Sequence, residues 1–77
     1  MPHIIVKLHP GRSEQQKARL AQAITKDVVA IAECEEKSVS VSIEEIRSED
    51  WAEKVYRPDV LDKPEMLYKK PGYNPFE

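Results

Sequence analysis

A run of helical spacing lies between two short runs of alternating apolar residues, and this order restricts the fold more than any other feature of the chain. Residues 3–8 place Ile4, Val6 and Leu8 on one face and Ile5 on the other, the period of two that is typical of a β-strand. The serine–valine run of residues 38–43 alternates in the same way. Between them, from residue 14 to about residue 33, four apolar side chains recur at helical spacing: Leu20, Ile24, Val28 and Ile31. A strand, a long helix and a second strand predict an α/β fold, a β-α-β unit with parallel strands and a right-handed crossover.

The residues between the first strand and the helix carry local signals for the end of the strand and for the start of the helix. Pro10 and Gly11 interrupt the strand pattern. Ser13 followed by Gln16 has the form of a capping box, in which each side chain bonds a free backbone amide at the start of a helix. We therefore expect the helix to begin directly after Ser13.

The size of the chain favours one domain that is completed by a second copy. A chain of 77 residues has room for a single small core, and two strands alone make a marginal sheet. We expect one domain over residues 1–77, with a core at 2–53 and a short helical C-terminal tail at 54–77, and a sheet completed by dimerisation. A homodimer is the expected assembly.

The tail is expected to be a covering segment. A helical turn opened by Ser48 around Trp51 should be followed by segments that proline residues break, the first at Pro58. The tail is rich in apolar side chains, namely Val55, Tyr56, Val60, Leu61, Met66, Leu67 and Tyr68. So many apolar residues predict that it covers the exposed sheet face or a subunit interface.

Charge and composition exclude several classes of partner. The net charge is −2, and Lys and Arg are scattered among Asp and Glu, which argues against nucleic acid or a membrane surface as the main partner. Lys69 and Lys70 form too short a basic run to indicate such a site. No membrane span or leader pattern is recognisable, so we expect a cytoplasmic protein. Cys34 is the only cysteine, and because His3 and His9 are the only histidines that could join it as ligands, no metal site is expected.

The residue with the most chemical potential is Pro2. Removal of Met1 would leave its secondary amine as the chain terminus, and such an amine titrates near roughly pH 8. Desolvation or a nearby cation would lower that pKa toward the range where a general base works best. Because Pro2 leads directly into a strand, the nitrogen would also be held in a fixed place. Alone, however, a proline that starts a strand is common.

Several features together resemble the 4-oxalocrotonate tautomerase family: Pro2 opening a strand, the Gly11-Arg12-Ser13 turn before a helix, the serine–valine strand, and Trp51. The tail sequence LYKKPGY is most similar to the small dimeric branch of that family. The resemblance implies that Pro2 is the catalytic base and acid of a keto-enol tautomerisation that needs no cofactor. It also implies that Arg12 binds the carboxylate of a small substrate, and that Trp51 forms an apolar wall of the pocket.

One departure from the family pattern concerns the second strand. The best-studied members carry a second arginine there, and an alignment without gaps places Ser40 at that position. A substrate whose 2-oxo group needs less polarisation, such as phenylenolpyruvate, is therefore favoured over a dicarboxylate. 2-Hydroxydienoates remain part of the expected substrate class. Two alternatives stay open: hydratase or dehalogenase chemistry on an unsaturated acid, with a protonated Pro2, and a dimeric module that binds a small ligand without catalysis.

Overall fold

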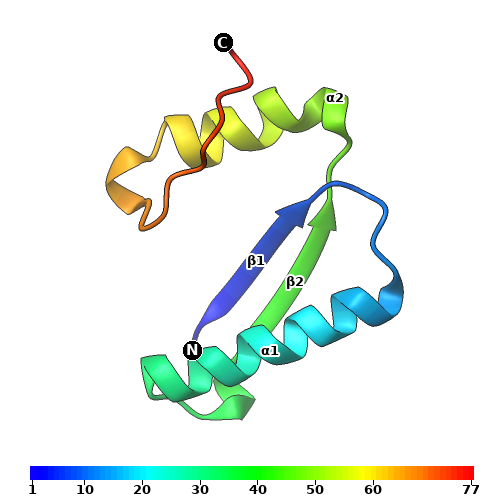
Figure 1. The fold of residues 1–77 in the computed structure, drawn as a ribbon. Helices are drawn as coiled ribbons and strands as arrows, with labels where there is room; N and C mark the ends of the chain where they lie inside the picture. Colours follow the sequence, from blue (N-terminus) through cyan, green and yellow to red (C-terminus); the bar gives the residue numbers. More distant parts are fainter. The chain divides into compact units, whose positions relative to one another are not determined.

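The computed structural model describes all of residues 1–77 and divides them into two compact units, Met1–Glu45 and Ile46–Glu77. The first unit contains β1 (His3–Leu8), α1 (Glu14–Ala32), the short 3-10 helix η1 (Glu36–Ser38) and β2 (Ser40–Glu45) (Figure 1). The second contains α2 (Ser48–Trp51), the π-helix η2 (Ala52–Leu61) that continues it, and the 3-10 helix η3 (Pro64–Met66). The single domain with its core at 2–53 and tail at 54–77 stays a prediction.

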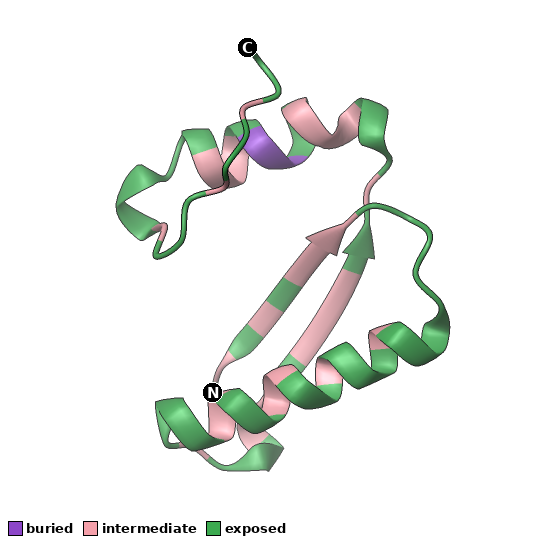
Figure 2. Ribbon diagram, in the orientation of Figure 1, coloured by how far each residue is buried: buried purple, intermediate pink, exposed green.

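The two strands are parallel, which confirms the predicted β-α-β unit. The register pairs Ile4 with Val41 and Val6 with Ile43, so the apolar side chains of both strands share one face. Helix α1 lies on that face, since Val41 and several α1 side chains line the same hollow. On the opposite face Ile5 keeps 52% of its surface exposed, and no residue of this unit is fully buried (Figure 2). Taken by itself, the first unit therefore has a thin core, and none of its own elements covers the second face of the sheet.

Helix α1 begins as predicted but is turned slightly from its predicted face. The side chains of Ser13 and Gln16 form the capping box reciprocally. Of the four apolar positions predicted to face the sheet, Ile24 and Val28 are half-buried, whereas Leu20 is 38% and Ile31 80% exposed. Smaller residues of the neighbouring row, Ala21, Thr25 and Val29, line the hollow toward β2 instead. The sheet therefore lies under a face that includes these smaller side chains, which allow closer approach.

The second strand starts two residues later than the predicted run of residues 38–43 and ends two residues later. Residues Glu36–Ser38 form η1, closed by a bond from the Val39 amide to the Glu36 carbonyl (3.1 Å). Pairing with β1 starts only at Ser40, whose amide bonds the Pro2 carbonyl (3.1 Å), and continues to the partner of Leu8. The length of β2 is thus decided by its partner strand, because each ladder hydrogen bond needs a group from both strands.

The second unit corrects one expectation about proline. We predicted a break at Pro58, but η2 passes through it. A proline inside an α-helix loses a bond and clashes with the carbonyl four residues earlier. The helix here has the wider π turn, with bonds that span five residues, such as the 3.0 Å bond from the Asp62 amide to the Arg57 carbonyl. Val55 and Tyr56, both on η2, are the only buried side chains of the molecule.

Candidate functional site

Pro2 is held by the backbone of both strands. It is half-buried at the start of β1, and its carbonyl accepts the amide hydrogen of Ser40 at 3.1 Å. This bond extends the parallel ladder one residue beyond the first β1 residue, His3. A terminal residue without such a bond would fray in solvent. The ladder therefore restricts where the Pro2 nitrogen lies relative to β2.

Beside Pro2, His3 and Ser40 form a side-chain pair. The Nδ1 atom of His3 lies 2.7 Å from Oγ of Ser40, and both residues are exposed. They are direct partners in the strand register, which is why a residue 37 positions away can reach the imidazole. The position where the family resemblance expects an arginine thus holds a hydroxyl that is already hydrogen-bonded to a neighbour.

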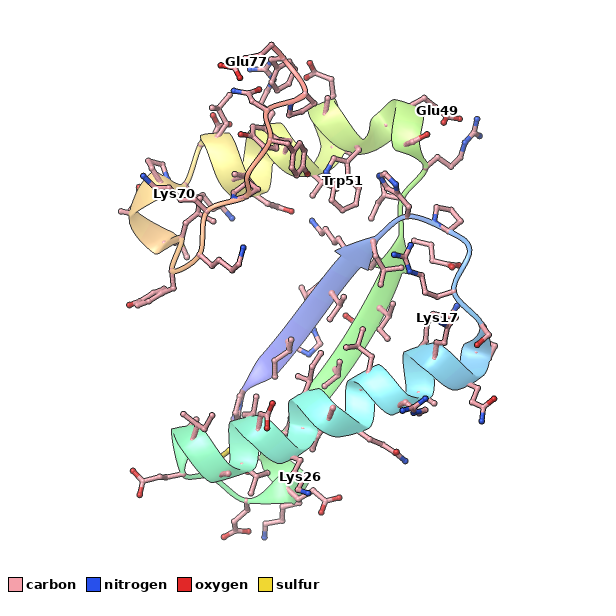
Figure 3. All side chains as sticks on the ribbon, viewed as in Figure 1. Lys17, Lys26, Glu49, Trp51, Lys70 and Glu77 are labelled. Carbon is pink, nitrogen blue, oxygen red and sulfur yellow. The ribbon has the colours of Figure 1, made fainter.

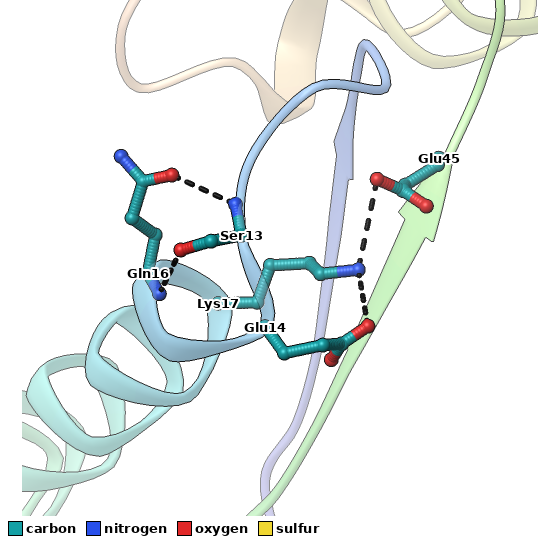
Figure 4. A network of polar contacts seen from close by, with 5 residues as sticks. All are labelled: Ser13, Glu14, Gln16, Lys17 and Glu45. Atoms are coloured by element: carbon teal, nitrogen blue, oxygen red, sulfur yellow. Dashed lines mark hydrogen bonds and ion pairs between the residues drawn. The ribbon is translucent and has the colours of Figure 1, made fainter.

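Arg12 follows a glycine whose conformation shapes the loop. Gly11 has φ of 127°, a region that side chains other than glycine rarely adopt. On the other side of Arg12, the Oγ of Ser13 accepts the Gln16 amide (3.1 Å), and the Ser13 amide donates to the Gln16 side chain (2.8 Å) (Figure 4). Arg12 is exposed between these two constraints. Its guanidinium is available to an anion from outside the chain.

An ion-pair network fastens the same end of α1 to the sheet. Nζ of Lys17 lies 3.1 Å from a Glu14 oxygen and 3.6 Å from an oxygen of Glu45 on β2, and the Lys17 side chain is only 17% exposed (Figure 4). The hydrogen bond that Lys17 donates to the Glu14 carboxylate, together with the attraction of the Glu14 and Glu45 carboxylates, raises the pKa of Lys17 above its usual value. The start of α1, and with it the loop that carries Arg12, is tied to the end of β2.

One copy of the chain does not bring Pro2 and Arg12 together. Pro2 precedes β1, and Arg12 follows it, so the two residues lie beyond opposite ends of the strand (Figure 1). A strand of six residues spans about 20 Å. A small substrate cannot contact both residues of the same chain. The hollow between α1, η1 and β2, about 510 Å³ in volume, is lined by neither of them.

Trp51, at the end of α2, belongs to a cluster within the second unit (Figure 3). Its indole Nε1 donates to the hydroxyl of Tyr73 at 2.7 Å. Tyr73 in turn packs against Tyr56, with ring centroids 5.5 Å apart, and its carbonyl accepts the Tyr56 hydroxyl at 3.2 Å. The C-terminal segment therefore folds back on the helix and contacts the residue that the sequence singled out.

The last residues of the chain strengthen this cluster. Phe76 lies edge-on to Tyr56 at 6.0 Å, and the guanidinium of Arg57 sits 4.5 Å above the Phe76 ring. Arg57 also donates two hydrogen bonds to the Glu53 carboxylate, at 3.0 and 3.3 Å, and these lower the pKa of Glu53. Sequence reasoning treated this segment as a cover and missed Tyr73 as a partner of Trp51. No local periodicity signals a contact across 22 residues.

The structure contains no group of three His, Cys, Asp or Glu side chains placed to hold a metal ion. None of its helices is long and apolar enough to cross a membrane.

Comparison with known proteins places most of the chain in one family. Residues 2–57 match the family model described as "Tautomerase enzyme". A protein described as a probable tautomerase of Xylella fastidiosa (strain 9a5c) is 40% identical over 73 residues, which cover 95% of this chain and 89% of the relative. Tautomerase PptA of Escherichia coli O127:H6 is 37% identical over 75 residues, covering 96% of this chain and 99% of its own. The similarity therefore extends through the tail.

Solved structures resemble the fold as well. TomN, described as a 4-oxalocrotonate tautomerase homologue of the tomaymycin biosynthetic pathway, superposes with a TM-score of 0.63 at 36% identity, covering 65% of this chain and 77% of TomN. A 4-oxalocrotonate tautomerase isozyme from Methylibium petroleiphilum gives a TM-score of 0.61 at 33% identity, covering 62% and 75% of the two chains.

Proposed function

This chain belongs to the 4-oxalocrotonate tautomerase family and is an isomerase, and from that premise we propose that it interconverts the enol and keto forms of small 2-hydroxy-enoic acids. Phenylenolpyruvate and 2-hydroxydienoates are the proposed substrate class. The reaction needs a base, a donor for the carboxylate and an apolar wall, which Pro2, Arg12 and Trp51 supply without a cofactor.

The proton is moved by the nitrogen of Pro2. After Met1 is removed, the neutral amine accepts the proton of the C2 hydroxyl, and C2=O forms as that O–H bond breaks. The electrons of the C2=C3 bond then form a C–H bond at C3 with the proton that the Pro2 ammonium returns. The amine ends neutral, so one proton has moved from oxygen to carbon and the catalyst is regenerated.

The observation that carries this proposal is the fixed position of Pro2. The 3.1 Å bond from the Ser40 amide to the Pro2 carbonyl holds the residue in the ladder, and this bond does not use the Pro2 nitrogen. A base that is held at one place loses less entropy when it meets the reacting atoms. The same residue at a frayed terminus would not be suited to this role.

The separation of Pro2 and Arg12 requires a site built from two copies. In a symmetric dimer whose sheets meet antiparallel, the end of β1 in one copy lies near the start of β1 in the other. Arg12 of the partner would then bind the carboxylate of a substrate at Pro2. The absence of any fully buried residue in the first unit supports a dimer, because a second copy would add the missing buried area.

The first experiment follows phenylenolpyruvate ketonisation by ultraviolet absorbance, with mass spectrometry to establish that the chain starts at Pro2. The wild type should accelerate the reaction, and Pro2→Ala should lose most of kcat while it keeps the folded spectrum. Because the base must be neutral, kcat/KM should rise with pH through the pKa of the amine. Activity that instead falls as pH rises would favour the hydratase reading. No acceleration with either substrate class would favour the binding module.

Mixed dimers test whether the site is shared. Pro2→Ala and Arg12→Ala should each be nearly inactive alone, and the mixture after subunit exchange should recover about a quarter of wild-type activity, because half of the dimers carry one intact site. A mixture as inactive as its components would place both residues in one subunit's site and contradict the arrangement. The cytoplasmic location stays a prediction.

A further inference from the structure

The hydroxyl group of Tyr73 has a proton that it can donate to a molecule from outside the chain. It accepts the indole N–H of Trp51 at 2.7 Å, and a phenol that accepts a hydrogen bond keeps its own proton to donate. Tyr73 as a whole is 51% exposed, so the residue is open to a molecule from outside. Accepting one hydrogen bond also makes the phenol a stronger donor.

The orientation of this hydroxyl is fixed from several sides. The carbonyl of Tyr73 accepts the hydroxyl of Tyr56 at 3.2 Å, and the two rings pack at 5.5 Å. Tyr56 itself is only 7% exposed and also contacts Phe76. Since the ring is anchored on a buried residue, the hydroxyl of this half-exposed residue is held in place, which is what a binding group requires.

The proposed chemistry needs a hydrogen-bond donor for the C2 oxygen of the substrate, a role that is not assigned to Pro2, Arg12 or Trp51. Negative charge develops on the C2 oxygen of the substrate, and a hydrogen bond to it lowers the barrier. Arg12 is assigned to the carboxylate, and the hydroxyl of Ser40 is already paired with His3 at 2.7 Å. The proton of Tyr73, one hydrogen bond away from the proposed Trp51 wall, is suited to the C2 oxygen.

From this arrangement we infer that Tyr73 is a substrate-binding residue, which donates a hydrogen bond to the 2-oxygen of a 2-oxo or 2-hydroxy acid that lies against Trp51. The inference rests on the proposed function for the place of Trp51. No proton is transferred by Tyr73, because its hydroxyl only stabilises the oxygen as charge develops. The C-terminal segment is then part of the proposed site.

The contact itself is tested by fluorescence, since Trp51 is the only tryptophan of the chain. Tyr73→Phe removes one oxygen atom and leaves the ring that packs on Tyr56. It should change the wavelength or intensity of Trp51 emission, whereas Tyr68→Phe should not, because Tyr68 is fully exposed in the same segment. Identical emission from all three proteins would overturn the inference.

Kinetics tests the role. Tyr73→Phe should lower kcat for phenylenolpyruvate about 10- to 100-fold with a small change in KM, because the bond strengthens as charge develops on the oxygen. Tyr68→Phe should stay within about twofold of the wild type. Trp51→Phe keeps the Tyr73 phenol and should lose less kcat than Tyr73→Phe. Wild-type kcat in Tyr73→Phe would refute the assignment, and so would an equal loss in Trp51→Phe, which would mean that Tyr73 only orients Trp51.

Ligand binding separates this inference from the proposed function. If the wild type is inactive, the tautomerase proposal fails, and quenching of Trp51 by phenylpyruvate, the keto form, still reports on Tyr73. Binding that is about five- to tenfold weaker in Tyr73→Phe alone would support the residue as a 2-oxo acid ligand. Equal affinity in the three proteins, or no quenching in the wild type, would refute it.

Discussion

Replacing Ser13 with Ala tests how local structure supports the proposed anion site. The serine hydroxyl accepts the Gln16 amide at 3.1 Å, whereas the reverse bond, from the Ser13 amide to the Gln16 side chain at 2.8 Å, uses no side-chain atom of Ser13. Ser13→Ala therefore removes one of the two bonds and leaves an exposed amide that water can reach. Loss of an N-cap lowers the free energy of unfolding by between about 0.5 and 2 kcal/mol. Because the second bond survives and water can bond the freed amide, we expect a loss of about 0.5–1 kcal/mol here.

Chemical denaturation at one fixed protomer concentration measures this difference, because dimer formation would make stability depend on concentration. A loss of 1 kcal/mol corresponds to a fall in Tm of roughly 4–8 °C for a chain of this size. Ser48→Ala is the matched control. Ser48 also starts a helix, but no side-chain cap is formed there, and its hydroxyl lies 3.4 Å from the Glu49 carboxylate. It should change stability by less than about 0.5 kcal/mol.

The same substitution should affect substrate binding, since Ser13 follows Arg12 directly. A looser helix start should raise KM for phenylenolpyruvate a few-fold with little change in kcat, and Ser13→Asp, which keeps an acceptor, should restore stability. If Ser13→Ala is as stable as Ser48→Ala, the capping box contributes nothing and the reasoning about this loop is wrong. If stability falls while KM is unchanged, Arg12 does not depend on the cap.

Two further substitutions test other parts of the molecule. Gly11→Ala should cost about 1–3 kcal/mol of stability, because φ of Gly11 is 127°; the added carbon itself meets no atom within 4 Å, so the cost is one of backbone strain alone. The strained loop should also raise KM through Arg12. Gly72→Ala, where φ is not positive, should be tolerated in the same denaturation assay. Glu53→Gln should be less stable than the wild type at neutral pH, because the hydrogen bonds from Arg57 lower the pKa of Glu53 from its usual 4.5. This contribution is complete above pH 4.5 and is lost as pH falls through the lower folded pKa, so the Tm gap should narrow steadily as pH is lowered below 4.5. A gap that stays constant would contradict the assignment.

Much of the first unit was predictable because its signals are local. The alternation at Ile4, Val6 and Leu8 and the Ser13–Gln16 pair report backbone geometry over a few residues, and helix α1 and the parallel strands followed from them. The candidate residues Pro2, Arg12 and Trp51 came from a resemblance. For Pro2 and Arg12, the structure adds that they lie beyond opposite ends of β1, and the proposal of a site shared by two copies rests on this separation.

The sequence by itself determined the order of strand, helix and strand, the capped start of α1 and the apolar face of the sheet, because each depends on side-chain period or on neighbouring hydrogen bonds. Only the tertiary structure decided that β2 runs from Ser40 to Glu45, that the helix continues through Pro58 and that Tyr73 accepts the Trp51 indole. In each of these cases the outcome depends on a partner distant in the sequence or on the cooperative hydrogen bonding of a whole helix, and no short pattern of residues encodes it.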